Sequence, residues 1–265
     1  MSTQKVETAG EFFDRYADTW QSYYTEGSSS QAFDYHNRQR VALELVEKFV
    51  PAGSSILEFG CGSGHTASRL AEMGHKLTCL DVSQGMVDKA RETFAEAGHQ
   101  AEFFHGVLDD LPDECGPFDA IMAFGVMDYI EDHSATLARI AQLLKPGGIC
   151  LLSFTNAGSP LRWVELPTKR LGALMAWMAT RDLKYRDVAL KSSKGNHRRE
   201  TISQYEKAGL TCEDTAYFSY GIRFRNHWIP PLSIVKRLDG PLSGGFLKGM
   251  GRGYMVVGRK RPQST

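Results

Sequence analysis

A glycine-rich segment, residues 56–64 (ILEFGCGSG), constrains the fold of this chain more than any other stretch. Its first four residues are apolar apart from Glu58, as expected at the end of a buried strand, and three glycines follow at alternate positions. Glycine permits tight turns and a close approach of backbone to a ligand. Residues 65–73 then carry apolar side chains at helical spacing, so the free N–H groups of a helix start face the loop. The segment predicts a strand–loop–helix unit that holds a small molecule.

The spacing of the glycines narrows the class of ligand. A dinucleotide fingerprint has its third glycine five residues after the first, but here His65 takes that place and Gly64 comes one residue earlier. A phosphate-binding Walker loop would need Gly-Lys-Ser/Thr, which the segment lacks. A nicotinamide-dependent oxidoreductase therefore stays only as an alternative, and the cofactor that raises the melting temperature would discriminate.

Strands and helices alternate after this loop. Asp81 ends the next apolar segment, and Ser83 is a suitable N-cap for a helix that runs to about Ala97. The breaker Lys145–Gly148 separates a later helix, 137–144, from the last strand of this series. Such alternation predicts an α/β fold with a doubly wound, mostly parallel sheet whose ligand sites lie beyond the carboxyl ends of the strands. The predicted strands are 56–59, 76–80, 101–105, 118–124 and 149–154.

Four segments organise the chain. Residues 1–50 carry two amphipathic helices, 11–24 and 34–49, which we expect to cover the ligand site, and residues 51–155 form the core. Residues 156–200, rich in basic and large apolar side chains, are predicted to be an inserted helical cap over an acceptor pocket, because the sheet needs only a short connection there. An independent helical pair on the sheet edge is the alternative. Residues 201–265 should supply a helix and two more strands.

Composition bounds the location and the partners. The formal net charge is zero, but residues 1–160 hold 11 Lys or Arg and 23 Asp or Glu, whereas residues 161–265 hold 20 and 8. The basic half indicates contact with an anionic group or a membrane surface, or simply a solvated basic surface. Five scattered cysteines without a Cys/His cluster predict no metal and no disulfide framework. We expect a cytoplasmic protein, since the longest apolar run is too short to span a bilayer.

Four segments stand in an order and spacing that resemble one superfamily. They are ILEFGCGSG, LDVSQGMVDKA, FDAIMAFGVMDYIED and LLKPGG, and together they resemble class I S-adenosylmethionine (SAM)-dependent methyltransferases, most of all the ubiquinone-biosynthesis O-methyltransferases. The resemblance implies a seven-stranded sheet that ends in an antiparallel strand pair. It also implies SAM as the cofactor and a small-molecule acceptor.

The resemblance implies contacts to the cofactor, position by position. The glycines would lie against the methionine part with Glu58 beneath its amino group, Asp81 would bind the ribose, and Met86 would pack near the adenine. An acid at the end of a strand also suits the ribose by its position alone, the alternative being that it only caps the next helix. The complete set of predicted cofactor residues is Tyr16, Arg40, Glu58, Gly60, Gly62, Gly64, Asp81, Val82, Met86, Val107, Leu108 and Phe124.

Three members of that set differ in their support. Arg40 sits where similar enzymes place an arginine on the SAM carboxylate, and a guanidinium suits that group because it binds carboxylates in a bidentate way; a solvated helix arginine is the alternative. Tyr16 matches a tyrosine that folds over the cofactor, or is simply core. At Val107 the family usually has aspartate, so adenine would depend on backbone N–H groups near Leu108, or on Asp109.

Methyl transfer from a sulfonium needs alignment, exclusion of water and, for a hydroxyl acceptor, removal of a proton. Where the family has a Glu-His pair after the fourth strand, this chain has Asp128 and Tyr129. Tyrosine is a poor base at neutral pH but can orient a hydroxyl or an amine. The other candidate bases are His36, His133, His197 and His227.

The leading hypothesis is an O-methyltransferase of a partly hydrophobic or anionic metabolite. N-methylation of a small amine and SAM binding without catalysis are the alternatives. No nucleic-acid acceptor is expected, because no N/D-P-P-Y motif follows the fourth strand and no catalytic cysteine motif is present.

Overall fold

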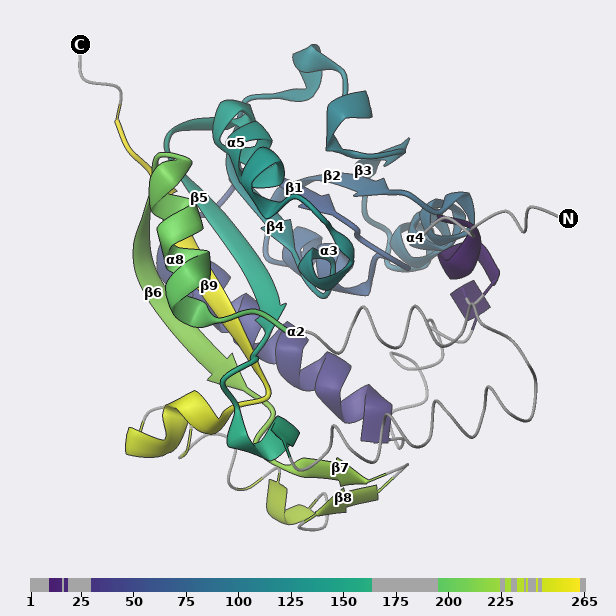
Figure 1. Ribbon diagram of the computed structural model, residues 1–265. Coiled ribbons are helices and arrows are strands. Elements are labelled where there is room, and N and C mark those ends of the chain that lie inside the picture. The colour runs from purple at the N-terminus through teal and green to yellow at the C-terminus, as the bar shows by residue number, and fades with distance from the viewer. Residues whose placement is uncertain are drawn as a thin grey trace, which may run out of the picture.

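The computed structural model describes residues 10–15, 17–18, 30–163, 195–224, 227–229, 233–235, 237, 242 and 245–262. These residues form a sheet with helices on both of its faces (Figure 1). The helices are α2 (Ser30–Phe49), α3 (His65–Glu72), α4 (Gln84–Glu96), α5 (His133–Leu143) and α8 (Arg198–Lys207). The sheet strands are β1 (Ser55–Phe59), β2 (Lys76–Asp81), β3 (Ala101–His105), β4 (Phe118–Ala123), β5 (Leu144–Thr155), β6 (Leu210–Phe218) and β9 (Gly253–Lys260).

The seven strands follow the order β3-β2-β1-β4-β5-β9-β6. The first five strands in sequence, β1 to β5, are parallel to one another, and β9 is antiparallel to both β5 and β6. The predicted mostly parallel, seven-stranded sheet with its final antiparallel pair is therefore confirmed. Because β9 inserts between β5 and β6, the last strand of the chain lies inside the sheet and not at its edge.

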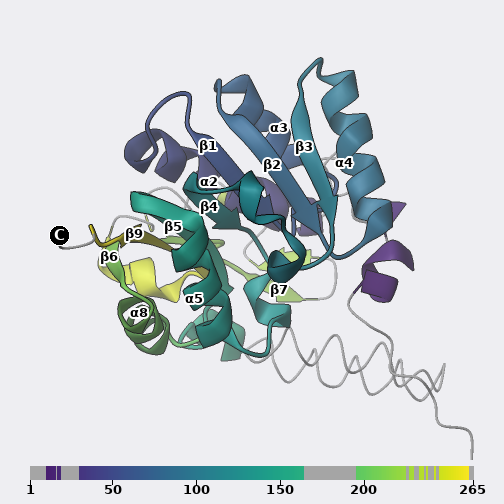
Figure 2. The ribbon, with the colours of Figure 1, turned by 90° about the horizontal axis from the view of Figure 1, so that it is seen from above.

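Alternating side chains give the sheet two buried faces. Ile56 packs in the core cluster that includes residues of α2, α3 and α4, whereas its neighbour Leu57 packs in the cluster that includes α5 and α8. Met122 and Ile121 on β4 divide in the same way, as the period of two in a strand requires. Helices α5 and α8 lie together on one side of the sheet and α2 and α3 on the other (Figure 2).

The adjacent strands β1 and β4 lead in opposite directions. β1 continues into α3 on one face, and β4 continues through the short 3-10 helix Met127–Tyr129 into α5 on the other face. A crevice opens at such a switch point, beyond the carboxyl ends of the strands, and ligands of doubly wound sheets bind there.

Two features differ from the prediction. Residues 145–148 do not break the chain between helix and strand, since they lie inside β5. The pairing of Phe118 with Leu144 is followed by a shift, after which Ala120 pairs with Ile149. A bulge thus accommodates the Pro-Gly-Gly sequence, in which Gly147 has φ +76°. The sequence analysis also missed a two-stranded hairpin, β7 (Ile222–Phe224) and β8 (His227–Ile229).

The predicted cap falls mainly on residues 164–194, which lie outside the described residues, so the cap stays a prediction. Its first residues are described: the Asn156 side chain donates to the carbonyl oxygens of Gly249 and Gly251 at 3.0 and 2.8 Å, which ties the end of β5 to the start of β9. In the described part of the chain, no helix combines the length and apolarity needed to cross a membrane.

The N-terminal helical turns dock beside the sheet. The Asp14 carboxylate accepts hydrogen bonds from the Ser83 hydroxyl at 2.5 Å and from the Gly85 N–H at 2.9 Å, at the start of α4. These bonds lower the pKa of Asp14. Asp14 therefore lies next to the carboxyl end of β2, and the covering role of the segment stays a prediction. Tyr16 lies outside the described residues.

Candidate functional site

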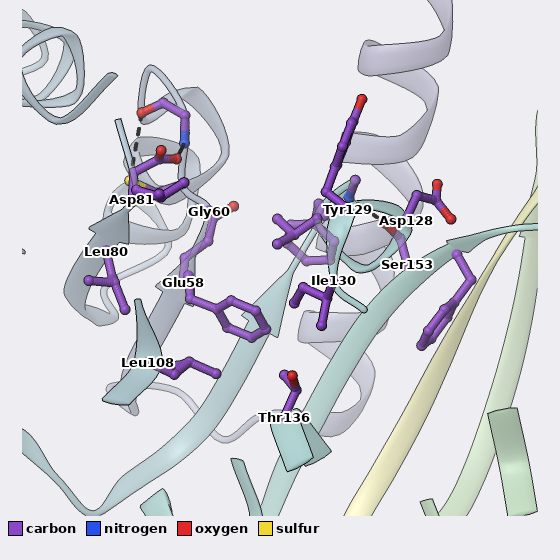
Figure 3. Close-up of a pocket in the computed structure, with 18 of the residues that line it drawn as sticks. Glu58, Gly60, Leu80, Asp81, Leu108, Asp128, Tyr129, Ile130, Thr136 and Ser153 are labelled. Atoms are coloured by element: carbon purple, nitrogen blue, oxygen red, sulfur yellow. Dashed lines mark hydrogen bonds between the residues drawn. The ribbon is translucent and has the colours of Figure 1, made fainter. Parts of the chain in front are cut away.

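A cavity of about 1250 Å³ opens at the carboxyl ends of the parallel strands. Its lining comes from the ends of β1, β2, β4 and β5, from α2 and α5, and from the starts of β9 and the segment after β5 (Figure 3). Small-molecule sites usually measure roughly 300–1,000 Å³. This cavity has room for two molecules side by side.

The glycine loop forms one wall of the cavity. Gly60 and Gly62 both line it, with φ of +64° and +54°. A Cβ on Gly62 would meet no atom within 4 Å, so a side chain there would project into open space, whereas a Cβ on Gly60 would lie 2.2 Å from Val126. Gly64 is not among the lining residues; a Cβ there would lie 2.9 Å from Ala90, so this glycine lets α3 pack against α4.

Asp81 holds the loop from the end of the neighbouring strand. One carboxylate oxygen accepts the N–H of Gly62 at 2.8 Å, and the other accepts the N–H of Ser83 at 3.0 Å. The cap of α4 is the Ser83 hydroxyl, which accepts the N–H of Met86 at 3.1 Å, so Asp81 is not the capping residue. Burial raises the pKa of Asp81, and its backbone hydrogen bonds oppose that shift. A carboxylate thus lines the cavity beside the loop.

Glu58 lies at the bottom of the same wall and is 2% exposed. Its Oε2 atom has no hydrogen-bond partner. Burial raises the pKa of Glu58 to about 8, while the Arg38 guanidinium lowers it and the Asp81 carboxylate raises it. A buried acceptor atom without a partner carries a desolvation cost, which a cationic ligand in the cavity would offset.

Glu58→Gln is expected to stabilise the free protein above neutral pH. The pKa of Glu58 is about 8 in the folded protein, whereas that of a glutamate in the unfolded chain is about 4.3. Because the folded state binds the proton more tightly, wild-type stability falls as pH rises through this window. Urea unfolding should show the variant gaining on the wild type between pH 5 and pH 8.

Glu44→Gln is the matched control, since Glu44 is on α2 with a side chain that is 57% exposed, in an ion pair with Arg40. It should follow the wild type at each pH. An equal stability difference between Glu58→Gln and the wild type at both pH values would contradict the assigned pKa.

Arg38, and not the predicted Arg40, reaches the cavity from α2. Arg40 pairs with Glu44 at 2.6 Å on the exposed side of the helix. A Cβ on Gly125, where φ is +79°, would lie 2.3 Å from Arg38 Nη1, so only glycine leaves room for this guanidinium. Helical spacing could have found it: Arg38 shares a face with the buried Val41, whereas Arg40 shares one with Glu44.

Asp128 and Tyr129 line the other part of the cavity, but they project in different directions from the same turn (Figure 3). The Asp128 carboxylate accepts hydrogen bonds from the Thr155 hydroxyl and from Asn196 Nδ2, the latter at 3.1 Å. Burial raises its pKa and the hydrogen bonds with Thr155 lower it. Burial and the Asp128 charge raise the pKa of Tyr129 to about 12, and the Tyr129 ring packs edge-on against Phe13.

Five further residues predicted to bind the cofactor line the cavity: Val82, Met86, Val107, Leu108 and Phe124. Asp109, the alternative considered for the adenine, lines the cavity as well. The Val107 N–H donates to the Asp110 carboxylate at 2.9 Å, so a residue not predicted from sequence takes that donor. Val107 itself is 52% exposed at the rim.

The histidines lie elsewhere. Of the eight in the chain, only His227 has a side chain outside the described residues, and none of the other seven lines the cavity. Burial lowers the pKa of His65, and the charge of His36 lowers it further. His133 contacts the Met127 carbonyl oxygen at 2.7 Å. His197 is exposed before α8. Of the predicted alternative bases, His36, His133 and His197 therefore lie outside the cavity lining.

Three further arginines, which the sequence analysis did not assign to the site, line the cavity: Arg139, Arg162 and Arg252. Arg162 follows β5 and is 5% exposed, with Nη1 donating to the Asn156 carbonyl oxygen at 3.1 Å. Arg252 precedes β9 and pairs with Asp34 of α2 at 3.0 Å. The fold alone brings these distant residues together, although Asp34 and Arg38 stand four residues apart on one helical face. In the described residues, no group of three or more His, Cys, Asp or Glu side chains could hold a metal.

Comparisons with known proteins show which families this chain resembles. The family described as methyltransferase domain matches residues 56–148. A ubiquinone biosynthesis O-methyltransferase of Xanthomonas axonopodis pv. citri (strain 306) is 33% identical over 123 residues, 46% of this chain and 52% of that protein. A tRNA 5-carboxymethoxyuridine methyltransferase of Escherichia coli (strain K12) is 30% identical over 136 residues, 50% and 51% of the two chains. The chain thus spans about half the length of these curated relatives.

A solved structure extends the likeness in fold to nearly the whole chain. Magnesium protoporphyrin IX methyltransferase from Synechocystis PCC 6803, with bound SAH, superposes with a TM-score of 0.63 at 17% identity and covers 95% of this chain and 97% of its own. At this identity the superposition concerns the fold alone.

Proposed function

We propose that this chain is a class I methyltransferase, which binds SAM in the cavity and transfers the methyl group to an oxygen of a small-molecule acceptor. The observation that carries the proposal is the buried Glu58 Oε2, which lacks a hydrogen-bond partner beside an open glycine cradle and a strand-end aspartate. The O-directed relative at 33% identity supports oxygen as the acceptor atom.

The described residues suit each part of SAM. The Glu58 carboxylate would bind the ammonium group, and the open space over Gly62 would take the methionine chain. Asp81 would accept hydrogen bonds from the ribose hydroxyls, because a carboxylate oxygen can accept more than one. Met86 and Leu108 would pack against the adenine. Arg38 would take the carboxylate-binding role expected of Arg40, since Arg38 lines the cavity and Arg40 does not.

Bound SAM supplies an electrophilic methyl group on a sulfonium, so the chain itself has to orient the acceptor and exclude water. Phe13 and Tyr129, in edge contact at 5.3 Å between ring centroids, supply an apolar wall. Asp128 is held by Thr155 and Asn196, so it stiffens the turn that carries Tyr129. We assign these residues to alignment of the acceptor. A cytoplasmic location and a membrane contact through residues 156–200 stay predictions.

Thermal unfolding with added ligands tests the proposal. A ligand that binds only the folded state raises the free energy of unfolding, by about 2.7 kcal/mol at 100 times its dissociation constant. The melting temperature rises as a result. SAM and S-adenosylhomocysteine should both raise it, and NAD⁺ and ATP should not. A rise with NAD⁺ and none with SAM would replace the proposal with the oxidoreductase alternative.

Tyr129→Phe is expected to lower turnover more than SAM affinity. The variant keeps the ring that contacts Phe13 and removes only the hydroxyl, so kcat/KM should fall by about tenfold, or about 1.4 kcal/mol, while the SAM Kd stays within about twofold. Asp128→Asn should behave alike, because the amide cannot accept hydrogen bonds from both Thr155 and Asn196 as the carboxylate does.

Steady-state kinetics with the first confirmed acceptor, and calorimetry with SAM, measure the two effects. Tyr217→Phe on β6 is the control, since this half-buried tyrosine is not among the residues that line the cavity. Full activity in both site variants would move the acceptor site elsewhere, with His227 next to examine.

A further inference from the structure

The part of the cavity next to Asp128 and Tyr129 combines arginines with a lack of bases. A hydroxyl or a protonated amine must lose a proton before it can attack a methyl group, and general bases serve that purpose. A carboxylic acid has a reference pKa of about 4, so at neutral pH it is already deprotonated and needs no base before it attacks. The residues around the acceptor position therefore indicate the kind of nucleophile.

Among the described residues that line the cavity, none is a histidine or a lysine. The pKa of Tyr129 is raised to about 12, which opposes loss of its own proton and service as a base. The lining acids near the acceptor are engaged: Asp128 accepts from Thr155 and Asn196, and Asp34 pairs with Arg252 at 3.0 Å. Asp132, which also lines the cavity, accepts the Ala135 N–H at 2.9 Å at the start of α5, so each of these acids is already engaged.

Arg162 is the buried cation of this region. Its Nη1 atom donates to the Asn156 carbonyl oxygen at 3.1 Å, and a Cβ on Gly195, where φ is +65°, would lie 2.2 Å from the same Nη1. The Asn156 carbonyl oxygen and the backbone at Gly195 therefore both lie close to this guanidinium. Its charge lowers the pKa of Asp128, so the two groups are electrostatically coupled within the cavity wall. A guanidinium has five N–H donors in a plane and binds a carboxylate through two parallel hydrogen bonds.

We infer that the acceptor atom is a carboxylate oxygen, which Arg162 orients toward the methyl group, so that the product is a methyl ester. The inference rests on the proposed function and names its substrate class. A lone pair of the carboxylate oxygen forms the new O–CH₃ bond as the S–CH₃ bond breaks, and the electron pair of that bond returns to sulfur. The negative carboxylate and the positive sulfonium give a neutral ester and a neutral thioether, and no proton is released.

The chemistry of the product distinguishes this inference from its rivals. The full chain is incubated with SAM labelled with tritium in its methyl group and with an acid and its matched rival. The pairs are benzoate and benzyl alcohol, cinnamate and cinnamyl alcohol, and decanoate and decylamine. A phenol, 4-methylphenol, is tested in addition. Mild alkali hydrolyses methyl esters and releases the label as volatile methanol, but it leaves methyl ethers and methylamines intact. We expect alkali-labile label from at least one acid and none from its partner.

Arg162→Gln is expected to lower kcat/KM for the accepted acid by about 20-fold, or about 1.8 kcal/mol, with the SAM Kd unchanged. Arg162→Lys keeps the charge without the bidentate geometry and should lose less, which separates carboxylate binding from a general loss of structure. Arg199→Gln, on an exposed residue of α8, is the control.

Each outcome decides between the claims. Alkali-stable label on an alcohol, the phenol or the amine overturns the carboxylate inference and leaves the proposed function standing. SAM binding without label on any acid also counts against the inference. Failure to bind SAM, measured by calorimetry in the same preparation, overturns the proposed function itself.

Discussion

Asp81→Ala and Gly62→Val should each weaken SAM binding by about 100-fold, or about 2.7 kcal/mol, in a protein that still folds. The first removes the carboxylate that accepts the Gly62 N–H at 2.8 Å and that we assign to the ribose. The second fills the cradle, because a Cβ on Gly62 would enter open space with no atom within 4 Å. Isothermal titration calorimetry measures the affinity, and circular dichroism checks the fold.

Two control variants reproduce the backbone strain of Gly62→Val and the lost hydrogen bonds of Asp81→Ala outside the cavity. Gly74→Val also places a side chain at positive φ, +88°, with no neighbour within 4 Å, but Gly74 is not among the cavity residues. Asp119→Ala removes a carboxylate that accepts the Ser55 N–H at 2.8 Å, at the amino ends of β1 and β4 and away from the cavity. Both should bind SAM like the wild type. Wild-type affinity in Asp81→Ala and Gly62→Val together would refute the cofactor site.

The second large effect separates two arginines on one helix. Arg38→Gln should weaken SAM binding by about 20-fold, or about 1.8 kcal/mol, because it removes the guanidinium beside Gly125 that we assign to the SAM carboxylate. Arg40→Gln removes an exposed i,i+4 ion pair with Glu44, which is worth at most about 0.5 kcal/mol, and a hydrogen bond to the Asn37 side chain. Neither contact lies in the cavity lining. Calorimetry of the two variants at the same pH makes the comparison. The reverse order of effects would restore the role that the sequence resemblance assigned to Arg40.

The sheet could be predicted because its information is local. Apolar runs such as Phe118–Phe124, buried on both faces, mark parallel strands, and the glycine loop and Asp81 mark the carboxyl ends of two of them. Once these are neighbours, the cofactor side of the cavity follows. Ser83 was recognised as a cap from residue type and position alone, and its hydroxyl accepts the expected N–H of Met86.

The acceptor side depends on contacts between distant parts of the chain. Arg162 and Arg252 lie 90 positions apart and meet at one cavity only because β9 inserts beside β5. Their charges carry no periodic signal in the sequence. Arg38 was within reach, since its spacing from Val41 places it on the buried face of α2, but the distance to the glycine loop favoured Arg40 instead. The bulge in β5 likewise results from pairing with β4, which overrides the breaking tendency of Pro146.

A crystal structure of the full chain with S-adenosylhomocysteine tests the central claim most directly. The account predicts the ligand in the cavity at the ends of β1 and β2, with its ammonium group on Glu58, its ribose hydroxyls on Asp81 and its carboxylate on Arg38. The sulfur should then face the part of the cavity lined by Tyr129 and Arg162. A ligand bound away from Glu58 and Asp81, or a cavity that stays empty at saturating S-adenosylhomocysteine, would contradict it.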